Sequence, residues 1–284
     1  MGPREIGGLS ACDLRYCAAY DRTMIIDLTG KSALVTGSTQ GIGLAIARGL
    51  AEAGAQVFVN GRSDESVERA IDEIARDLPT AQLSGFVADL TAPGAPDDAP
   101  ADIDILVNNL GIFGATPALE IDDAEWQRYF DTNVMTAVRL IRSYLPGMKQ
   151  RGWGRVLNIA SDSAIVTPVE MIHYGMSKTA LLAVSRGFAK DAAGTGVTVN
   201  SVIAGPTHTG GVEDFVYELV DRSLPWEEAQ REFMRTQRPQ SLLQRLIEPE
   251  EIANMVVYLS SPLASATTGG AVRVDGGYVD SILP

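Results

Sequence analysis

The chain has 284 residues, 45% of them hydrophobic, and its 36 acidic and 23 basic side chains give a net charge of −13. This length suits one large α/β domain or two small ones. Nucleic acid is excluded as an expected partner, because an acidic surface repels the phosphate backbone. A membrane-spanning segment is also excluded, since the sequence holds no uninterrupted apolar run of about 18 residues.

The first 23 residues are predicted to be a loose tail ahead of a domain that spans 24–284. They lack the long apolar run of a secretory signal, and they contain the two cysteines of the sequence, Cys12 and Cys17. Two cysteines five apart can pair or bind a metal, but no further cysteine accompanies them and the two histidines lie far along the chain. We therefore expect no metal site and a reducing, cytoplasmic location.

Apolar runs of strand length alternate with amphipathic segments of helix length. In chain order the sequence predicts a strand at 31–36, a helix at 42–53, a strand at 56–60, a helix at 64–78, strands at 83–88 and 103–108, a helix at 125–150, a strand at 154–160, a helix at 174–193, a strand at 197–202, a helix at 250–259 and a strand at 271–274. Several strands are continuously apolar, which is typical of parallel strands buried on both faces. The alternation predicts a single doubly wound, Rossmann-type parallel sheet of about seven strands with helices on both faces.

Two segments interrupt this alternation. Pro93, Pro96 and Pro100 exclude an uninterrupted helix in the segment between 89 and 104. Residues 207–246 form a long polar and aromatic insertion directly after a strand, where α/β enzymes place ligand contacts. Its aromatic side chains predict either an apolar lid or the packing of a helix pair. They are Phe215, Tyr217, Trp226 and Phe233.

A glycine-rich turn joins the first predicted strand to the first predicted helix. It reads Thr36-Gly37-Ser38-Thr39-Gln40-Gly41-Ile42-Gly43. Glycines allow a tight turn and a close approach of the backbone to a phosphate, and a helix N-terminus supplies N–H groups and partial positive charge for a pyrophosphate. The strand before the motif and the helix after it make a dinucleotide site the favoured interpretation.

The spacing Gly-x3-Gly-x-Gly resembles that of the short-chain dehydrogenase/reductase family, whose usual motif is Thr-Gly-x3-Gly-x-Gly. The resemblance runs from about Leu28 to the end of the chain. Its further matches, in order, are Asp89-Leu90, Asn108-Asn109-Leu110-Gly111, Asn133, Ser161, Tyr174-x3-Lys178 and Val274-Asp275-Gly276-Gly277. The resemblance implies an oxidoreductase that moves a hydride between a nicotinamide and a small-molecule alcohol or carbonyl carbon. It also implies a homodimer or homotetramer that packs through the helices at 125–150 and 174–193.

The end of the second predicted strand indicates which nicotinamide nucleotide is used. An NAD-specific enzyme needs a carboxylate there to bind the ribose hydroxyls, but the corresponding residue is Gly61. Arg62 follows, and a guanidinium can hold the 2′-phosphate of NADP through paired, charge-assisted hydrogen bonds. In the family this arrangement marks NADP users. We predict NADP(H) as the cofactor; the alternative is that Arg62 is a solvated surface side chain.

The resemblance implies contacts around the whole nucleotide. Asp89 and Leu90 would frame the adenine, and the loop around Gly205 would touch the nicotinamide carboxamide. The complete expected set is Gly37, Ser38, Thr39, Gln40, Gly41, Ile42, Gly43, Arg62, Ser63, Asp89, Leu90, Asn109, Gly111, Tyr174, Lys178, Gly205, Pro206, Thr207 and Thr209. Two positions depart from the family pattern. Leu110 stands where Ala is common, and Ala204-Gly205-Pro206 stands where the family reads Pro-Gly.

Tyr174 and Lys178 are the predicted proton-transfer pair. They are four residues apart at the start of a predicted helix, so they share a face. A tyrosine is a poor base at neutral pH, and a nearby ammonium favours the phenolate and lowers its pKa. Tyr174 would then take a proton from an alcohol or give one to a carbonyl. By resemblance, Lys178 would also hold the nicotinamide ribose.

The resemblance completes a catalytic set of Asn133, Ser161, Tyr174 and Lys178. Ser161 would hydrogen-bond the substrate oxygen, with Ser163 as the alternative. Asn133 would kink its helix and hold a water that leads protons to the lysine. His173 should not share the face of Tyr174, because adjacent helix residues point about 100° apart. His208, in the insertion, is a possible substrate contact.

Two other functions remain as alternatives. One is a lyase or dehalogenase that keeps Ser and Tyr but abandons the nucleotide, and the other is a non-catalytic, NADP-sensing protein. The intact glycine turn and Arg62 argue against the first, and the presence of both Tyr174 and Lys178 argues against the second. The substrate is left open, because the insertion is compatible with acyl carriers, steroids, sugars or small ketones.

Overall fold

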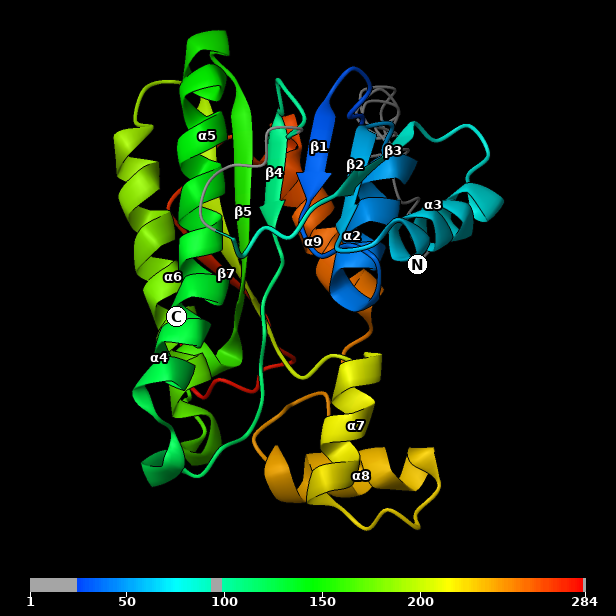
Figure 1. Cartoon of the computed structure of the whole chain (residues 1–284), viewed down its shortest axis with the longest axis vertical. Coiled ribbons are helices and arrows are strands. Elements are labelled where there is room, and N and C mark those ends of the chain that lie inside the picture. Colours follow the sequence, from blue (N-terminus) through cyan, green and yellow to red (C-terminus); the bar gives the residue numbers. More distant parts are fainter. Residues whose placement is uncertain (1–24, 93–98, 283–284) are drawn as a thin grey trace, which may run out of the picture.

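A single parallel sheet organises the molecule. The computed structural model describes residues 25–92 and 99–282, and it contains seven strands in the order β3-β2-β1-β4-β5-β6-β7 (Figure 1). Every strand pairing is parallel. The predicted doubly wound, Rossmann-type sheet is confirmed.

The strands lie close to their predicted positions. They are β1 (Ser32–Val35), β2 (Gln56–Gly61), β3 (Leu83–Val87), β4 (Ile105–Asn108), β5 (Gly154–Ser161), β6 (Val197–Ala204) and β7 (Ala271–Val274). The eight residues of β5 and of β6 are all buried, as expected for the centre of a sheet covered on both faces. The strand β5 runs one residue further than predicted, so Ser161 ends the strand and does not follow it.

Helices cover both faces of the sheet. They are α2 (Gly41–Glu52), α3 (Asp64–Asp77), α4 (Asp123–Phe130), α5 (Thr136–Arg151), α6 (Ile172–Asp191), α7 (Gly210–Leu219), α8 (Trp226–Gln237) and α9 (Pro249–Ser260). Apolar side chains of α2, α3 and α9 share one core with the strands, and those of α5 and α6 share another. These two cores hold the sheet between two helical layers.

The long helix predicted at 125–150 is not regular. Between α4 and α5 lies a π-helical turn, η2 (Asp131–Met135), which contains Asn133. Turns of this kind occur mostly inside α-helices and often at functional sites. The expectation of an irregularity at Asn133 is therefore met by a wider helical turn.

The predicted insertion at 207–246 contains α7 and α8. Figure 1 shows this helix pair beyond the carboxyl edge of the sheet. The pair has a small core of its own, formed by Phe215, Val216, Ala229, Phe233, Met234 and Leu246 together with Met171. An independent core allows the pair to stand as one wall of a site at that edge.

Some predictions fall on residues that the structure does not describe. Cys12 and Cys17 lie outside the described residues, as do Pro93 and Pro96. In the segments that are described, the helices lack the combination of length and apolar character that a bilayer crossing requires.

The order of the strands indicates where a ligand-binding crevice is expected. The chain passes from β1 outward to β2 and β3, and then returns to β4 on the other side of β1. At such a reversal the two connections leave the sheet in opposite directions, which opens a crevice at the carboxyl ends of the strands. The glycine turn follows β1 at this point.

Candidate active site

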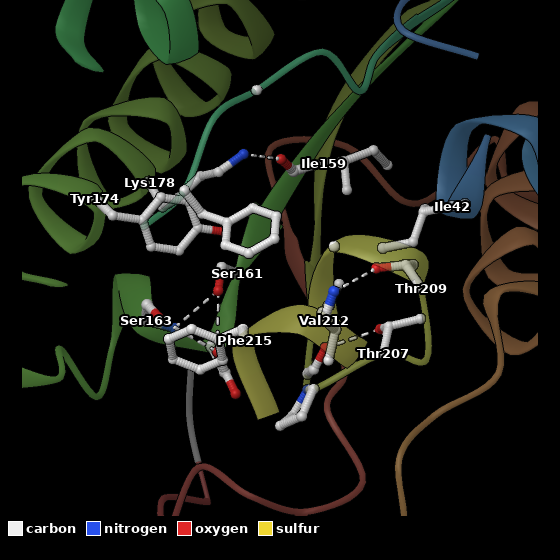
Figure 2. Close-up of a pocket in the computed structure, with 18 of the residues that line it drawn as sticks. Ile42, Ile159, Ser161, Ser163, Tyr174, Lys178, Thr207, Thr209, Val212 and Phe215 are labelled. Carbon is white, nitrogen blue, oxygen red and sulfur yellow. Dashed lines mark hydrogen bonds between the residues drawn. The ribbon is translucent and has the colours of Figure 1, made fainter. Parts of the chain in front are cut away.

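A pocket of about 330 Å³ lies at the carboxyl edge of the sheet. Figure 2 shows Tyr174, Lys178 and Ser161 on one side of it, and Ile42, Thr207 and Thr209 on the other. Many of the predicted cofactor residues line this pocket. They are Gly37, Gln40, Gly41, Ile42, Gly43, Asn109, Gly111, Tyr174, Lys178, Gly205, Pro206, Thr207 and Thr209.

The glycine turn presents bare backbone to the pocket. Gly37 and Gly41 have φ angles of 59° and 55°, a region that side chains disfavour. A Cβ on Gly43 would lie 2.4 Å from the carbonyl oxygen of Gly37 and 2.5 Å from Nδ2 of Asn109. The helix α2 has no side-chain cap and no acidic residue in its first turn, so its N-terminus suits a phosphate group.

Two asparagines hold the glycine turn in place. Nδ2 of Asn109 donates to the carbonyl oxygens of Thr36 and Gly37, both at 3.0 Å. Oδ1 of Asn60 accepts from the backbone N–H of Gly37 at 3.0 Å, and its Nδ2 donates to the carbonyl oxygen of Phe86 at the same distance. This role of Asn60 was not expected from the sequence. The available signal was a polar residue inside an apolar strand.

The strand end that would meet the adenosine ribose cannot hold a carboxylate without rearrangement. A Cβ on Gly61 would lie 2.5 Å from Cγ2 of Thr39 and 2.9 Å from Cγ2 of Val67. Arg62 is exposed directly after β2. Hydrogen bonds from Thr91 lower the pKa of Asp89, and the charge of Arg62 lowers it further by a smaller amount.

Three predicted cofactor residues serve mainly to build the outer half of the site. Ser38 is fully buried, and its hydroxyl accepts from the backbone N–H of Asn60 and donates to the carbonyl oxygen of Val35. Ser63 caps α3 by accepting a hydrogen bond from the backbone N–H of Ser66. The side chain of Leu90 is buried in the core, so it presents no side chain to a nucleotide.

Ser161 and Tyr174 face the pocket from neighbouring elements. Burial raises the pKa of the Tyr174 phenol, a hydrogen bond with Ser161 opposes the rise, and the charge of Asp162 adds to it. Nζ of Lys178 lies 5.7 Å from the centroid of the Tyr174 ring. The expected lowering of this pKa is not met by the protein alone: the pKa of the phenol is raised, and burial is the largest cause.

Lys178 is buried where the helix α6 crosses β5. Its Nζ donates to the carbonyl oxygen of Ile159 at 2.9 Å, and burial lowers the pKa of the ammonium to about 8. A Cβ on Gly111 would lie 3.3 Å from this Nζ and 3.2 Å from Oδ1 of Asn133. The bare Cα of Gly111 thus lets Lys178 and Asn133 approach the same point.

Asn133 is held by both of its side-chain groups. Its Oδ1 accepts from the backbone N–H of Ile112 at 2.8 Å, and its Nδ2 donates to the carbonyl oxygen of Ile112 at 3.0 Å and to Oγ of Ser177 at 2.9 Å. These contacts tie the π-helical turn to α6 and to the loop after β4. All four predicted catalytic residues are therefore gathered at one edge of the sheet.

Comparison with known proteins agrees with this arrangement. A family model described as enoyl-(acyl carrier protein) reductase matches residues 37–279. The chain belongs to the short-chain dehydrogenase/reductase family. The resemblance to this family that the sequence motifs indicated is therefore confirmed. The expectation that the protein is an oxidoreductase is confirmed with it.

Relatives of this short-chain dehydrogenase/reductase match it over nearly their whole length. It is 49% identical over 263 residues to the uncharacterized oxidoreductase YvaG of Bacillus subtilis (strain 168), covering 91% of this chain and 100% of the relative. It is 34% identical over 260 residues to a D-beta-hydroxybutyrate dehydrogenase of Cupriavidus necator, covering 89% and 99%. The crystal structure of L-sorbose reductase from Gluconobacter frateurii, complexed with NADPH and L-sorbose, matches with a TM-score of 0.85 at 30% identity, covering 91% of this chain and 100% of that one.

The two departures from the pattern of short-chain dehydrogenases/reductases have different consequences. The side chain of Leu110 packs against the core between the sheet and α5, so it does not narrow the pocket. Ala204 ends β6 and lines the pocket together with Gly205. A Cβ on Gly205 would lie 2.7 Å from Cα of Asp275, so the backbone there is as tightly packed as in the glycine turn.

Neither histidine lines the pocket with the predicted proton-transfer pair, Tyr174 and Lys178. His173 is buried, and its ring packs against those of Tyr129 and Trp126 at centroid distances of 4.0 and 6.2 Å. The prediction that it turns away from Tyr174 is confirmed. His208 stacks on Trp226 at 5.2 Å and contacts Glu213 at 2.7 Å, and it is not among the residues that line the pocket.

The aromatic residues of the insertion divide into two groups. Phe215 and Phe233 pack edge to face at a centroid distance of 6.3 Å, and both line the pocket. Tyr217 and Trp226 pack against each other at 5.8 Å on the side of the helix pair that does not line it. The predicted packing of a helix pair is therefore confirmed for all four aromatic side chains, and the apolar lid stays a prediction.

One acidic residue in the pocket, Asp162, was not expected from the sequence. Asp162 follows Ser161 directly, lines the pocket and is buried. Burial raises the pKa of its carboxyl, while hydrogen bonds from Ser161 and Ser163 and the charge of Arg238 oppose the rise. Ser163, the alternative to Ser161, also lines the pocket, and its backbone N–H donates to Oγ of Ser161 at 3.1 Å.

Proposed function

We propose that this protein is an NADP(H)-dependent oxidoreductase that interconverts an alcohol and a carbonyl compound, with Tyr174 as the proton donor and acceptor. The observation that carries the proposal is the convergence of Ser161, Tyr174 and Lys178 on one pocket with the bare glycine turn. The NADPH-bound L-sorbose reductase, similar over 91% of this chain, supports the same assignment.

The site's residues fit a dinucleotide. Gly37, Gly41 and Gly43 allow the turn to pack closely against Leu110, Thr209 and Asn109, and the uncapped end of α2 offers N–H groups to a pyrophosphate. Gly205, Thr207 and Thr209 would border the nicotinamide, with Lys178 at its ribose. The bound nicotinamide supplies or accepts the hydride.

The protein's own groups position the substrate and move one proton. Ser161 holds the substrate oxygen, next to the phenolic hydroxyl of Tyr174. During reduction, Tyr174 gives its proton to that oxygen as negative charge develops there. The raised pKa keeps the phenol protonated at neutral pH, which is the form that reduction requires. Phe113, Phe215 and Phe233 give this side of the pocket an apolar lining.

The preference for NADP(H) is assigned to Gly61 and Arg62. A side chain at position 61 would force Thr39 or Val67 to shift, which disfavours the carboxylate that usually binds the ribose hydroxyls of NAD. Asp64 and Glu65 in the first turn of α3 already offset the positive end of that helix. Arg62 is therefore the group we assign to the 2′-phosphate.

The Arg62→Ala variant tests this assignment. Because a hydrogen-bonded charge pair contributes roughly 1.5–3 kcal/mol, we expect NADPH binding to weaken about 10- to 100-fold and NADH binding to stay the same. Titration with each nucleotide, followed by nicotinamide fluorescence, measures both. The control is Arg69→Ala, which removes an exposed arginine from α3, within the same part of the fold.

Each outcome of this titration has a distinct meaning. An unchanged ratio of NADPH to NADH affinity in Arg62→Ala would show that Arg62 is a solvated surface residue. A wild-type preference for NADH would refute the cofactor assignment and leave the reductase intact. Binding of neither nucleotide would favour the nucleotide-free lyase or dehalogenase.

A further inference from the structure

The hydroxyl of Ser161 has one proton, and a neighbouring carboxyl group accepts a hydrogen bond from it. Oγ of Ser161 donates to Oδ1 of Asp162 at 2.9 Å and accepts from the backbone N–H of Ser163 at 3.1 Å. Asp162 is the first residue of the short turn η3 (Asp162–Ala164), directly after β5. A serine hydroxyl carries a single donor. While Ser161 donates to Asp162, it has no donor left for the substrate oxygen.

The proposed reaction needs that donor. Negative charge develops on the substrate oxygen, and a hydroxyl that donates to it stabilises the transition state. Tyr174 also forms a hydrogen bond with Ser161, and Figure 2 shows both side chains at the pocket. A substrate oxygen that replaces this contact would accept from both hydroxyls. Ser161 therefore has to redirect its proton from Asp162 to the substrate.

Two changes can redirect the proton of Ser161. The hydroxyl can rotate away from an ionised Asp162, which breaks a charge-assisted hydrogen bond inside the protein. Alternatively, Asp162 can carry a proton itself and donate to Oγ of Ser161, which keeps the 2.9 Å contact and reverses its direction. Oγ then accepts from Asp162 and from the N–H of Ser163, and its own proton can reach the substrate. The second change breaks no hydrogen bond.

The surroundings of Asp162 favour the protonated carboxyl. The residue is 6% exposed, its Oδ1 also accepts from Oγ of Ser163 at 3.4 Å, and its Oδ2 has no hydrogen-bond partner among the described residues. Burial is the largest influence on the pKa of this carboxyl and raises it, while hydrogen bonds from the two serines and the charge of Arg238 oppose the rise. A carboxylate with an unpartnered oxygen costs more to bury than the neutral acid does.

We propose that Asp162 is a positioning residue: in its protonated form it donates to Ser161, which turns the Ser161 proton toward the substrate oxygen. When Asp162 loses its proton to solvent, the carboxylate again accepts the hydrogen bond from Ser161, and the substrate oxygen loses one of its two donors. This inference rests on the proposed function, because it takes Ser161 and Tyr174 to hold the reacting oxygen. Reduction is therefore expected to slow as the pH rises through the ionisation of Asp162.

Other titratable and charged groups surround Asp162. The elements α6 and β6 pack against η3; β6 carries no titratable side chain, and α6 contributes Tyr174 and Lys178. Arg238 at the end of α8 and Tyr278 after β7 interact with Asp162 through charge. Burial raises the pKa of both tyrosines above 10, so they stay protonated up to pH 9.5. Burial lowers the pKa of Lys178 to about 8, so this lysine can add a pH-dependent step, and every variant in the test keeps it.

The test measures kcat/KM for the reduction of 2,3-butanedione by NADPH at pH 5.5 and at pH 9.5. We expect the fall between these pH values to be roughly 10- to 100-fold larger in the wild type than in Asp162→Asn, the effect of one hydrogen bond to a charged group. The amide of this variant donates to Ser161 at every pH and does not titrate. Ser161→Ala has no hydroxyl to orient, so its fall should be as small as that of Asp162→Asn. The ratio within each protein is the readout, so a general loss of activity cancels.

Asp214→Asn is the matched control, because it removes an exposed carboxylate from α7 and is expected to keep the wild-type fall. Equal falls in the wild type and in Asp162→Asn would overturn the inference. A wild-type fall that persists in Ser161→Ala would overturn it too, because Asp162 would then act through its charge on Tyr174 and not through the serine. If Asp162→Asn does not fold, as judged by circular dichroism, Ser161→Ala decides alone.

A failure of the proposed function is recognisable separately. The wild type would then oxidise no NADPH with the diketone at either pH. Binding of 2,3-butanedione, followed by saturation-transfer NMR, would replace turnover as the readout. A signal that weakens from pH 5.5 to pH 9.5 in the wild type and stays constant in Asp162→Asn would support the role of Asp162. Any other pattern, including the absence of a signal, would refute it.

Discussion

Tyr174→Phe is expected to lower kcat about 10²- to 10⁴-fold, the range of a general acid or base, while NADPH still binds. The substitution removes one hydroxyl and keeps the ring, which packs edge to face against Phe113 at a centroid distance of 6.4 Å. The pocket should therefore keep its shape. Turnover of a carbonyl substrate and titration with NADPH measure the two effects separately.

The control for Tyr174→Phe is Tyr217→Phe on α7. The Tyr217 hydroxyl donates to the carbonyl oxygen of Leu224, and Tyr217 does not line the pocket. Its loss should change kcat by less than about twofold. A Tyr174→Phe enzyme that kept most of its turnover would assign the proton to another group. A wild type that binds NADPH and turns over no substrate would instead favour the non-catalytic, NADP-sensing alternative.

Lys178→Met is expected to abolish most turnover and yet to stabilise the protein at pH 7. Burial lowers the pKa of this ammonium from 10.5 to about 8, which corresponds to about 3 kcal/mol of destabilisation when the group is charged. Methionine has a similar length and no charge, but it loses the hydrogen bond to Ile159, worth about 1 kcal/mol. The expected net gain in the free energy of unfolding is about 2 kcal/mol.

The pH dependence of this effect has a definite sign. The folded protein releases the Lys178 proton near pH 8, whereas the unfolded chain keeps it up to about pH 10.5. Between these values the unfolded state binds more protons, so the stability of the wild type rises with pH. The advantage of Lys178→Met should therefore be complete below pH 8 and should shrink above it. Urea unfolding at pH 7 and pH 9.5 measures the difference, and a variant less stable than the wild type at pH 7 would contradict the expectation.

Motifs of fixed spacing were the part of the site that could be predicted from the sequence. The glycine turn follows a strand, and Tyr174 and Lys178 share one helical face, so local geometry places each of them. Ser161 could be placed because the carboxyl ends of parallel strands meet at one edge. For these residues the spacing along the chain carries most of the spatial information.

Residues that depend on their surroundings could not be predicted in the same way. The role of Asn60 comes from its position beside Gly37, which only the pairing of β1 with β2 creates. Asp162 has one carboxylate oxygen without a hydrogen-bond partner among the described residues, a property that no sequence pattern displays. The raised pKa of Tyr174 also depends on the surroundings, because its largest cause is the burial of the phenol by the folded chain.

The π-helical turn at Asn133 also sets how α4 is rotated about its axis relative to α5. A regular helix advances about 100° per residue, so removing one residue from the turn would rotate α4 by about that angle relative to α5. Tyr129 on α4 packs on His173 at 4.0 Å, directly before Tyr174. The same irregularity thus places Asn133 near Lys178 and Tyr129 against His173, so single-residue insertions or deletions in 131–135 should be tolerated far less than substitutions.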